Sequence, residues 1–154
     1  MILIREVHGK DLSNQARELF IEYQKSLDID LNFQNFDLEL KWLPLPYLLP
    51  KGCLLLAYTE NKLAGCVGLR KFEHDICEMK RLYVRPEFRR KKIGLELSKS
   101  IIRRAKELRY KSMRLDTLPF MKEAVNLYLS LGFKEIAPYR YNPFENAKFF
   151  ELKL

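Results

Sequence analysis

Residues 78–95 read EMKRLYVRPEFRRKKIGL, and they join an apolar strand through a turn at Pro86 directly to the basic start of a helix. The first turn of a helix leaves about four backbone N–H groups without partners and carries roughly half a positive charge. Phosphate oxygens bind there because they meet both hydrogen-bond donors and a favourable field. Four cationic side chains stand at this junction: Arg89, Arg90, Lys91 and Lys92. The junction therefore predicts an anion-binding site, although short basic runs taken alone are usually solvated charge runs or nucleic-acid patches.

The same stretch resembles motif A of the GNAT superfamily of N-acetyltransferases, in which an Arg/Gln-x-x-Gly-x-Gly/Ala loop holds the pyrophosphate of acetyl-coenzyme A. Arg89 and Gly94 match the first and last positions of that loop. Lys92 replaces its middle glycine, and Arg90 stands where family members often carry another glycine. Glycine adopts positive φ at little cost. We therefore expect Arg90 and Lys92 to keep negative φ, since otherwise the affinity for the cofactor would suffer.

The resemblance implies that acetyl-coenzyme A is the co-substrate and that its pyrophosphate lies against the loop and the helix start. Those cofactor-binding residues are Arg89, Arg90, Lys91, Lys92, Ile93, Gly94 and Leu95. It also implies that free backbone groups of the preceding strand receive the pantetheine arm, at Leu82, Tyr83 and Val84. The same N–H groups could stabilise the oxyanion that forms during acyl transfer.

A second motif ends at Phe133 and reads AVNLYLSLGF. Four of its residues recur at helical spacing: Ala124, Leu127, Tyr128 and Leu131. Gly132 is suited to end such a helix. The segment resembles motif B of the same superfamily, whose tyrosine lies near the thioester sulfur, and this resemblance implies that Tyr128 protonates the departing thiolate. The alternative is that Tyr128 is an ordinary core residue of an amphipathic helix.

Glu78 is the candidate general base. A lysine-like amine with a pKa of about 10.4 is only about one part in a few thousand neutral at pH 7, so a base is useful for acyl transfer to it. Glu78 lies eleven residues before Arg89, much the interval at which several enzymes of the resembled superfamily place a strand glutamate base. The alternative is an ion-pairing carboxylate next to Lys80, and the sequence does not decide between the two.

Hydrophobic periodicity along residues 1–154 predicts the element order β-α-α-β-β-β-α-β-α-β-β. This is the order of the resembled fold, so the resemblance implies a single N-acetyltransferase (GNAT) domain over residues 1–154. The expected fold is a three-layer α/β (α+β) arrangement, with a central, mostly antiparallel mixed sheet flanked by helices. Asp11 is expected to cap the first helix. The strand over 76–84 loses its alternation after Lys80, which predicts a bulge.

Composition places the chain among globular proteins, with 154 residues, 47% hydrophobic and 31% charged. The longest apolar stretch, 42–50, is interrupted by two prolines and is far too short to span a membrane. An odd number of cysteines without Cys-x-x-Cys spacing predicts reduced, buried thiols at Cys53, Cys66 and Cys77. The two histidines stand outside any ligand motif, so no metal is expected. We interpret the protein as cytoplasmic, with no membrane partner.

The acceptor is expected to be a primary amine of a small molecule or peptide, and the resemblance implies that it enters near residues 23–47 and 139–144. Those stretches carry acidic and aromatic side chains that suit a cationic amine: Asp28, Asp30, Asp37, Glu39, Phe33, Phe36, Trp42 and Tyr47. For each of these residues, a solvated helix face or the core is the alternative. The sequence leaves the acyl length and a homodimer open.

Two other function classes compete with an active enzyme. The two lost glycines favour a catalytically weak acyl-coenzyme A binding or regulatory domain. A net charge of +8 favours a basic nucleic-acid-binding module. The nucleic-acid class is the weaker, because the phosphates of coenzyme A already explain a basic loop and no nucleic-acid motif is present.

Overall fold

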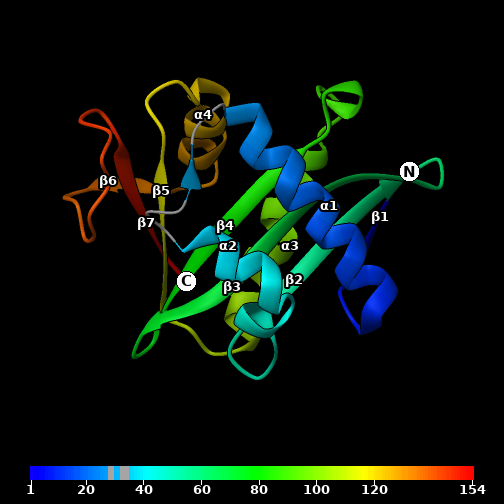
Figure 1. Ribbon diagram of the computed structural model, residues 1–154. Coiled ribbons are helices and arrows are strands. Elements are labelled where there is room, and N and C mark those ends of the chain that lie inside the picture. Colours follow the sequence, from blue (N-terminus) through cyan, green and yellow to red (C-terminus); the bar gives the residue numbers. More distant parts are fainter. Residues whose placement is uncertain (28–29, 32–34) are drawn as a thin grey trace.

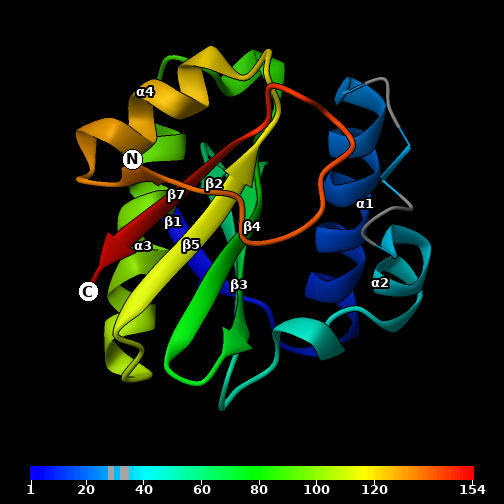
Figure 2. The ribbon, with the colours of Figure 1, turned by 90° about the vertical axis from the view of Figure 1, so that its left-hand side faces the viewer.

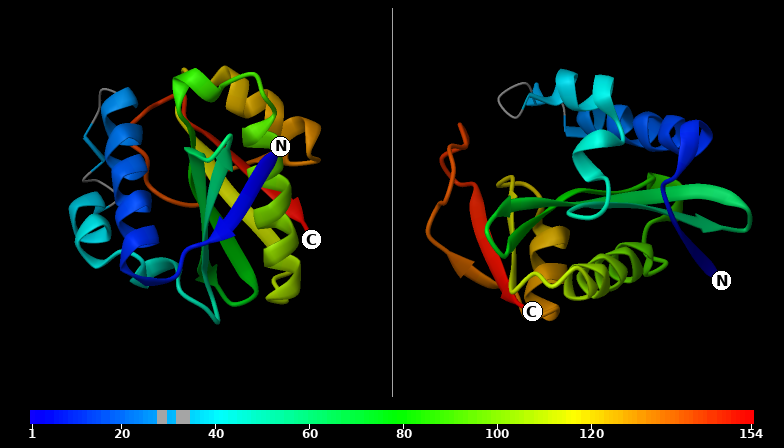
Figure 3. Two further views of the ribbon diagram at one scale, coloured as in Figure 1. Left: turned by 90° about the vertical axis from the view of Figure 1, so that its right-hand side faces the viewer. Right: turned by 90° about the horizontal axis from the view of Figure 1, so that it is seen from below.

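The computed structural model describes residues 1–27, 30–31 and 35–154. A seven-stranded sheet with the order β1-β2-β3-β4-β5-β7-β6 forms its centre. Helices α1 and α2 cover one face of the sheet, and α3 and α4 cover the other (Figures 1 and 2). The view from below in Figure 3 shows the three layers in profile. The elements are β1 (Ile2–Glu6), α1 (Gly9–Leu27), α2 (Phe36–Trp42), η2 (Leu45–Tyr47), β2 (Cys53–Thr59), β3 (Lys62–Glu73), β4 (Ile76–Val84), η3 (Pro86–Phe88), α3 (Ile93–Glu107), β5 (Ser112–Thr117), α4 (Lys122–Ser130), β6 (Lys134–Ile136) and β7 (Lys148–Lys153).

Five of the six pairings between neighbouring strands of the described sheet are antiparallel, and β4 with β5 is the parallel one. A parallel pair requires a crossover, and α3 supplies it by running back across the sheet. The predicted element order and the mixed sheet are therefore confirmed.

Two apolar layers hold the helices to the sheet, because successive side chains of a strand point to opposite faces. On strand β2, Leu55 packs in the layer that contains α3, whereas Leu54 and Leu56 pack in the layer that contains α1. Leu97 of α3 and Phe20 of α1 are fully buried in these layers. The sheet is covered on both faces, and β2 is apolar and buried from Cys53 to Ala57 because neither of its faces meets solvent there.

The helix ends differ from expectation at one place. Helix α1 begins at Gly9, so Asp11 lies inside its first turn and is not the cap. Gly9 has φ of +75°, which glycine adopts easily, and the chain can therefore turn into the helix three residues earlier than a cap at Asp11 predicts. Gly132, with φ of +99°, follows α4 as predicted.

The three cysteines are free and buried on strands β2, β3 and β4, as the sequence predicted. None of the described helices is long and apolar enough to cross a membrane. Within the described ranges, no three His, Cys, Asp or Glu side chains are grouped so that they could hold a metal ion.

Candidate active site

Strands β4 and β5 diverge in the middle of the sheet. Their parallel pairing covers three positions only, which are Ile76 with Ser112, Cys77 with Met113, and Glu78 with Arg114. Beyond Glu78 the two strands separate, as Figure 1 shows for the green and yellow arrows. The edge of β4 that faces β5 therefore has no strand partner among the described residues from 79 onward. Such an edge presents backbone N–H and C=O groups to a ligand.

A bulge in β4 lies at this point of divergence. Tyr83 stands opposite Cys66 and Lys80 opposite Gly68, so Arg81 and Leu82 together face one residue of β3. Arg81 has φ of +60°, a left-handed conformation that costs a non-glycine residue energy. The predicted bulge is confirmed, and it re-aims the side chains that line the gap.

The gap between β4 and β5 contains a cavity of about 40 Å³, which we call the candidate pocket. It has room for a small group. Its polar lining comes from five elements or loops, and consists of Tyr23, Lys80, Arg81, Asp116, Thr117, Tyr128 and Asn142. Asn142 donates a hydrogen bond of 3.3 Å to Asp116. The hydroxyl of Thr117 is buried and has no hydrogen-bond partner in the described part of the chain. Buried hydroxyls are normally hydrogen-bonded, so this one is available to a polar ligand in the pocket.

Tyr128 reaches the candidate pocket from α4. Its ring packs against Phe133 and Phe150, with centroids 5.7 and 6.4 Å away. Its hydroxyl makes no hydrogen bond with any described group. Burial raises the pKa of Tyr128, and Tyr23 and Asp116 raise it further, so the hydroxyl keeps its proton at neutral pH. The ring thus belongs to the core, and Tyr128 lines the pocket with a hydroxyl that keeps its proton.

Lys80 lines the same pocket and is only 4% exposed. Burial lowers its pKa to about 7, and the charge of Arg81 acts in the same direction, whereas Glu78 and Asp116 oppose the shift. From the sequence, Lys80 is a neighbour of Glu78 and the point after which the strand loses its alternation, with no sign of a role in the site. Its burial has no local signal, because lysine is almost always a solvent-exposed residue.

Glu78 is 1% exposed and lines a neighbouring groove, not the candidate pocket. Its carboxylate accepts hydrogen bonds from the hydroxyl of Tyr139 at 2.9 Å and from Nη2 of Arg140 at 3.2 Å. Nε of Arg70 lies 3.6 Å away. Glu78 thus makes the ion-pair contacts that we expect if it is an ion-pairing carboxylate, which was the alternative to a general base. Sequence reasoning missed its three partners, which stand 8 to 62 residues away along the chain.

The loop before α3 corrects one expectation. Arg90 and Lys92 have φ of +64° and +65°, although we expected both to be negative. The chain passes from η3 into α3 within four residues, and this tight entry requires left-handed backbone at two positions whatever their side chains. The cost is about 1–2 kcal/mol at each. The loop therefore keeps a backbone that normally calls for glycine.

The start of α3 fits a phosphate group. Among the described residues, the backbone N–H groups of Ile93, Gly94 and Leu95 find no acceptor in the protein. A Cβ on Gly94 would lie 3.7 Å from Leu127 and 3.8 Å from Val84, which are ordinary contacts. The fold itself therefore does not require glycine at 94. A glycine at this position leaves room for a ligand to approach the backbone, and the three N–H groups could hold a phosphate of coenzyme A.

The expected acceptor residues divide among different environments. Glu39 is buried against Arg81, with hydrogen bonds of 2.8 and 3.0 Å. Phe36 and Tyr47 are core residues, while Asp37 and Trp42 are exposed. Asp28 and Phe33 lie outside the described residues. Asp30 is exposed.

Comparison with known proteins identifies the family. The model of the acetyltransferase (GNAT) family matches residues 14–133. The chain belongs to the GNAT family. A relative named uncharacterized N-acetyltransferase C1271.07c, from Schizosaccharomyces pombe, is 45% identical to this GNAT protein over 86% of the chain and 83% of the relative. A Dictyostelium discoideum relative named uncharacterized N-acetyltransferase is 34% identical over 99% of the chain and 100% of the relative.

Solved structures agree on the fold of this GNAT protein. A GNAT acetyltransferase from Staphylococcus aureus superposes with a TM-score of 0.81 at 23% identity, over 99% of both chains. A putative acetyltransferase from Salmonella typhimurium, solved with its cofactor acetyl-CoA, superposes with a TM-score of 0.75 at 18% identity, over 99% of this chain and 93% of that one.

Proposed function

We propose that this protein transfers an acetyl group from acetyl-coenzyme A to a primary amine of a small molecule or peptide. The observation that carries the proposal is the candidate pocket itself. It lies where β4 and β5 diverge, and Tyr128 lines it with a hydroxyl that makes no hydrogen bond to the described residues. The start of α3, whose first N–H groups find no acceptor among the described residues, follows the same strand. Residues 1–154 would act together as one catalytic domain, and the three free thiols fit a cytoplasmic location.

Acetyl-coenzyme A would supply an activated acetyl thioester. We propose that residues 89–95 bind its pyrophosphate and that Leu82, Tyr83 and Val84 offer backbone groups to its pantetheine arm. Backbone N–H groups fixed in advance stabilise developing negative charge at little reorganisation cost. The solved Salmonella structure with acetyl-CoA supports this choice of cofactor through a shared fold.

Two side chains of this chain would handle protons. Tyr128 would donate its proton to the leaving sulfur, since its raised pKa keeps the hydroxyl protonated. Glu78 would receive the proton of the amine through water, as the family resemblance implies for this strand glutamate, because it lines the neighbouring groove and not the pocket. Lys80 is a second candidate for that base, because it lines the same pocket as Tyr128 and burial lowers its pKa to about 7.

A binding or regulatory role without catalysis is the competing function. This alternative was supported by the loss of two loop glycines. Arg90 and Lys92 nevertheless adopt the positive φ that glycine usually supplies, so the loop keeps its backbone shape and the argument is weaker. The test is an assay of thiol release from acetyl-coenzyme A with a panel of amines, combined with calorimetric titration of coenzyme A. Binding together with amine-dependent thiol release supports the enzyme. Binding without release from any amine supports the regulatory alternative.

A further inference from the structure

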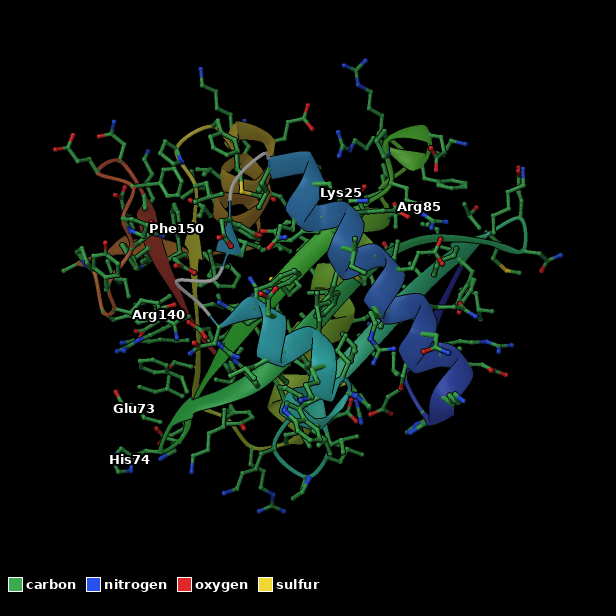
Figure 4. All side chains as sticks on the ribbon, in the orientation of Figure 1. Lys25, Glu73, His74, Arg85, Arg140 and Phe150 are labelled. Atoms are coloured by element: carbon green, nitrogen blue, oxygen red, sulfur yellow. The ribbon has the colours of Figure 1, made fainter. Side chains whose placement is uncertain are left out.

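A second hollow, of about 560 Å³, lies on the α2 side of the sheet next to the candidate pocket. We call it the basic groove, and its charged lining consists of Lys51, Arg70, Lys71, Glu78 and Arg140. Four cations thus face one carboxylate. Figure 4 shows Arg140 on the same side of the molecule as the β3–β4 turn, and far from Arg85. A groove with this excess of positive charge favours an anionic ligand.

The two guanidinium groups of the basic groove have unused donors. Arg70 lies 3.6 Å from Glu78 and 3.8 Å from Glu39, and it makes no hydrogen bond with any described group. Arg140 uses Nη2 for Glu78, while its Nε is buried without a partner among the described residues. A guanidinium carries five N–H donors in a fork that matches a carboxylate. Partly buried donors of this kind are normally satisfied, so they point to a bound anion.

The remaining wall of the groove is apolar. Leu45 and Leu48 line it from η2 and the loop that follows, and Phe72 lines it from β3. Leu45 is 58% and Leu48 is 42% exposed. An apolar wall beside cationic donors suits a carboxylate that is attached to a hydrophobic side chain.

The groove and the candidate pocket adjoin along β4. Glu78 lines the groove and Lys80 lines the pocket, two positions further along the same strand. Residues i and i+2 of a strand share a face and lie about 7 Å apart. One acceptor can therefore present its amine to the pocket and an anionic group to the groove. That separation matches about two residues of an extended peptide.

We propose that the basic groove binds the carboxylate of the acceptor, and that the acceptor is a dipeptide-sized amine with an apolar C-terminal side chain. The inference rests on the proposed acetyl transfer. Glycyl-leucine is a probe of this chemistry, and acetylglycyl-leucine is the corresponding product. Both probes lose their negative charge when the C-terminus is an amide.

Binding is measured first, so that the result does not depend on catalysis. Calorimetric titration of the coenzyme A-loaded protein should detect acetylglycyl-leucine, with binding at least tenfold weaker for its C-terminal amide. Arg70→Gln should abolish this preference, whereas Lys111→Gln, an exposed cation outside the groove, should keep it. The exposed groove residue Lys51 gives a second variant, Lys51→Gln, in case Arg70→Gln fails to fold.

Equal binding of acid and amide, or binding of neither, would overturn the proposal. Tighter binding of an aminoalkyl phosphonate than of the carboxylate would reassign the groove to phosphate. Thiol release with glycyl-leucine is the separate test of acetyl transfer. Selective binding of the carboxylate without thiol release would therefore refute the transfer and leave the groove assignment standing.

Discussion

The carboxylate of Glu39 accepts hydrogen bonds from Nε and Nη2 of Arg81, at 2.8 and 3.0 Å, and each side chain is only 3% exposed. Arg81 is the left-handed residue of the β4 bulge, and Glu39 belongs to α2. The pair therefore ties a short helix to the point where β4 leaves β5. The shape of the candidate pocket depends on this contact between residues 42 positions apart.

Glu39→Ala should lower the free energy of unfolding by about 3–5 kcal/mol, because it removes a carboxylate that accepts two hydrogen bonds from the buried Arg81 cation. Asp37→Ala removes an exposed carboxylate from the same helix and should change stability by less than about 0.5 kcal/mol. Urea denaturation compares the two variants. A similar small effect for both would mean that the pair contributes nothing to stability.

The same pair predicts a dependence on pH. Burial raises the pKa of Glu39, but the hydrogen bond and charge of Arg81 outweigh it, so the pKa is lowered overall. A lowered carboxyl pKa stabilises the protein above its unfolded value of 4.5, and that contribution is lost as the pH falls through the folded pKa. The difference in stability between wild type and Glu39→Ala should therefore shrink in acid. A constant difference down to pH 2 would contradict this assignment.

Gly94→Ala should fold normally, since its Cβ meets only ordinary contacts, yet it should weaken coenzyme A binding by crowding the phosphate. Gly94→Asp should weaken binding further, because it adds negative charge at the same place. Thermal unfolding checks the fold, and calorimetric titration measures the affinity. Unchanged affinity in a folded Gly94→Asp variant would remove the loop from the cofactor site.

Lys92→Gly and Lys91→Gly form a matched pair, since both remove one cation from the loop but only Lys92 has positive φ. Glycine relieves left-handed strain at position 92, whereas at position 91 it adds entropy to the unfolded chain and removes the contact of Lys91 with the Phe88 ring. Lys92→Gly should be more stable than Lys91→Gly by about 1 kcal/mol. Denaturant unfolding measures the difference, and the reverse order would contradict the strain.

Arg90 and Lys92 are also predicted to bind coenzyme A through charge. The affinity of wild type should then fall more steeply with added salt than that of the double variant Arg90→Gly with Lys92→Gly. Titrations at several salt concentrations give the two slopes. Equal slopes would mean that these side chains point into solvent.

Tyr128→Phe should lower turnover about ten- to a thousand-fold while leaving the affinity for coenzyme A nearly intact, because only the hydroxyl is lost. Tyr110→Phe is the control, since the Tyr110 hydroxyl donates to the backbone of Lys51 outside the candidate pocket. Thiol release with an accepted amine gives both rates. Near wild-type turnover in Tyr128→Phe would leave catalysis to proximity alone.

Lys80→Met and Glu78→Gln distinguish the two candidate bases. If neutral Lys80 accepts the proton, the wild-type rate falls as the pH drops below about 7, and Lys80→Met loses this limb while Glu78→Gln keeps it. If Glu78 is the base, Lys80→Met keeps this fall of the rate and Glu78→Gln loses it. Besides burial, the described groups with the largest effect on the pKa of Lys80 are Arg81 and Arg70, which lower it, and Glu78 and Asp116, which raise it.

The stability of Lys80→Met provides an independent check. The folded pKa of Lys80, about 7, lies below its ordinary value of 10.5, so the buried ammonium destabilises wild type most at or below pH 7. That cost disappears as the pH rises from about 7 to about 10. Lys80→Met should therefore be more stable than wild type by a few kcal/mol at pH 7, and the gap should close in alkali.

Local signals in the sequence determined most of the architecture. The strand Ile76–Val84 was predicted with its observed bounds, and Gly132 was predicted to end α4. The bulge after Lys80 was also read from the broken alternation of that strand. These features depend on periodicity and on backbone preferences of a few neighbouring residues, which a sequence displays directly. The family motifs added the candidate roles of Tyr128 and Glu78.

Only the tertiary structure decided which charges are buried and which side chains meet. Lys80 lies in the pocket because the sheet and α1 enclose it, and the residues next to it in the sequence do not indicate that it is buried. Glu78 meets Tyr139 and Arg140, sixty-one and sixty-two residues away, because the segment between β6 and β7 returns to β4. The left-handed loop at Arg90 and Lys92 follows from how η3 joins α3. Burial and ion pairing depend on partners that folding brings together, so a propensity of single residues cannot predict them.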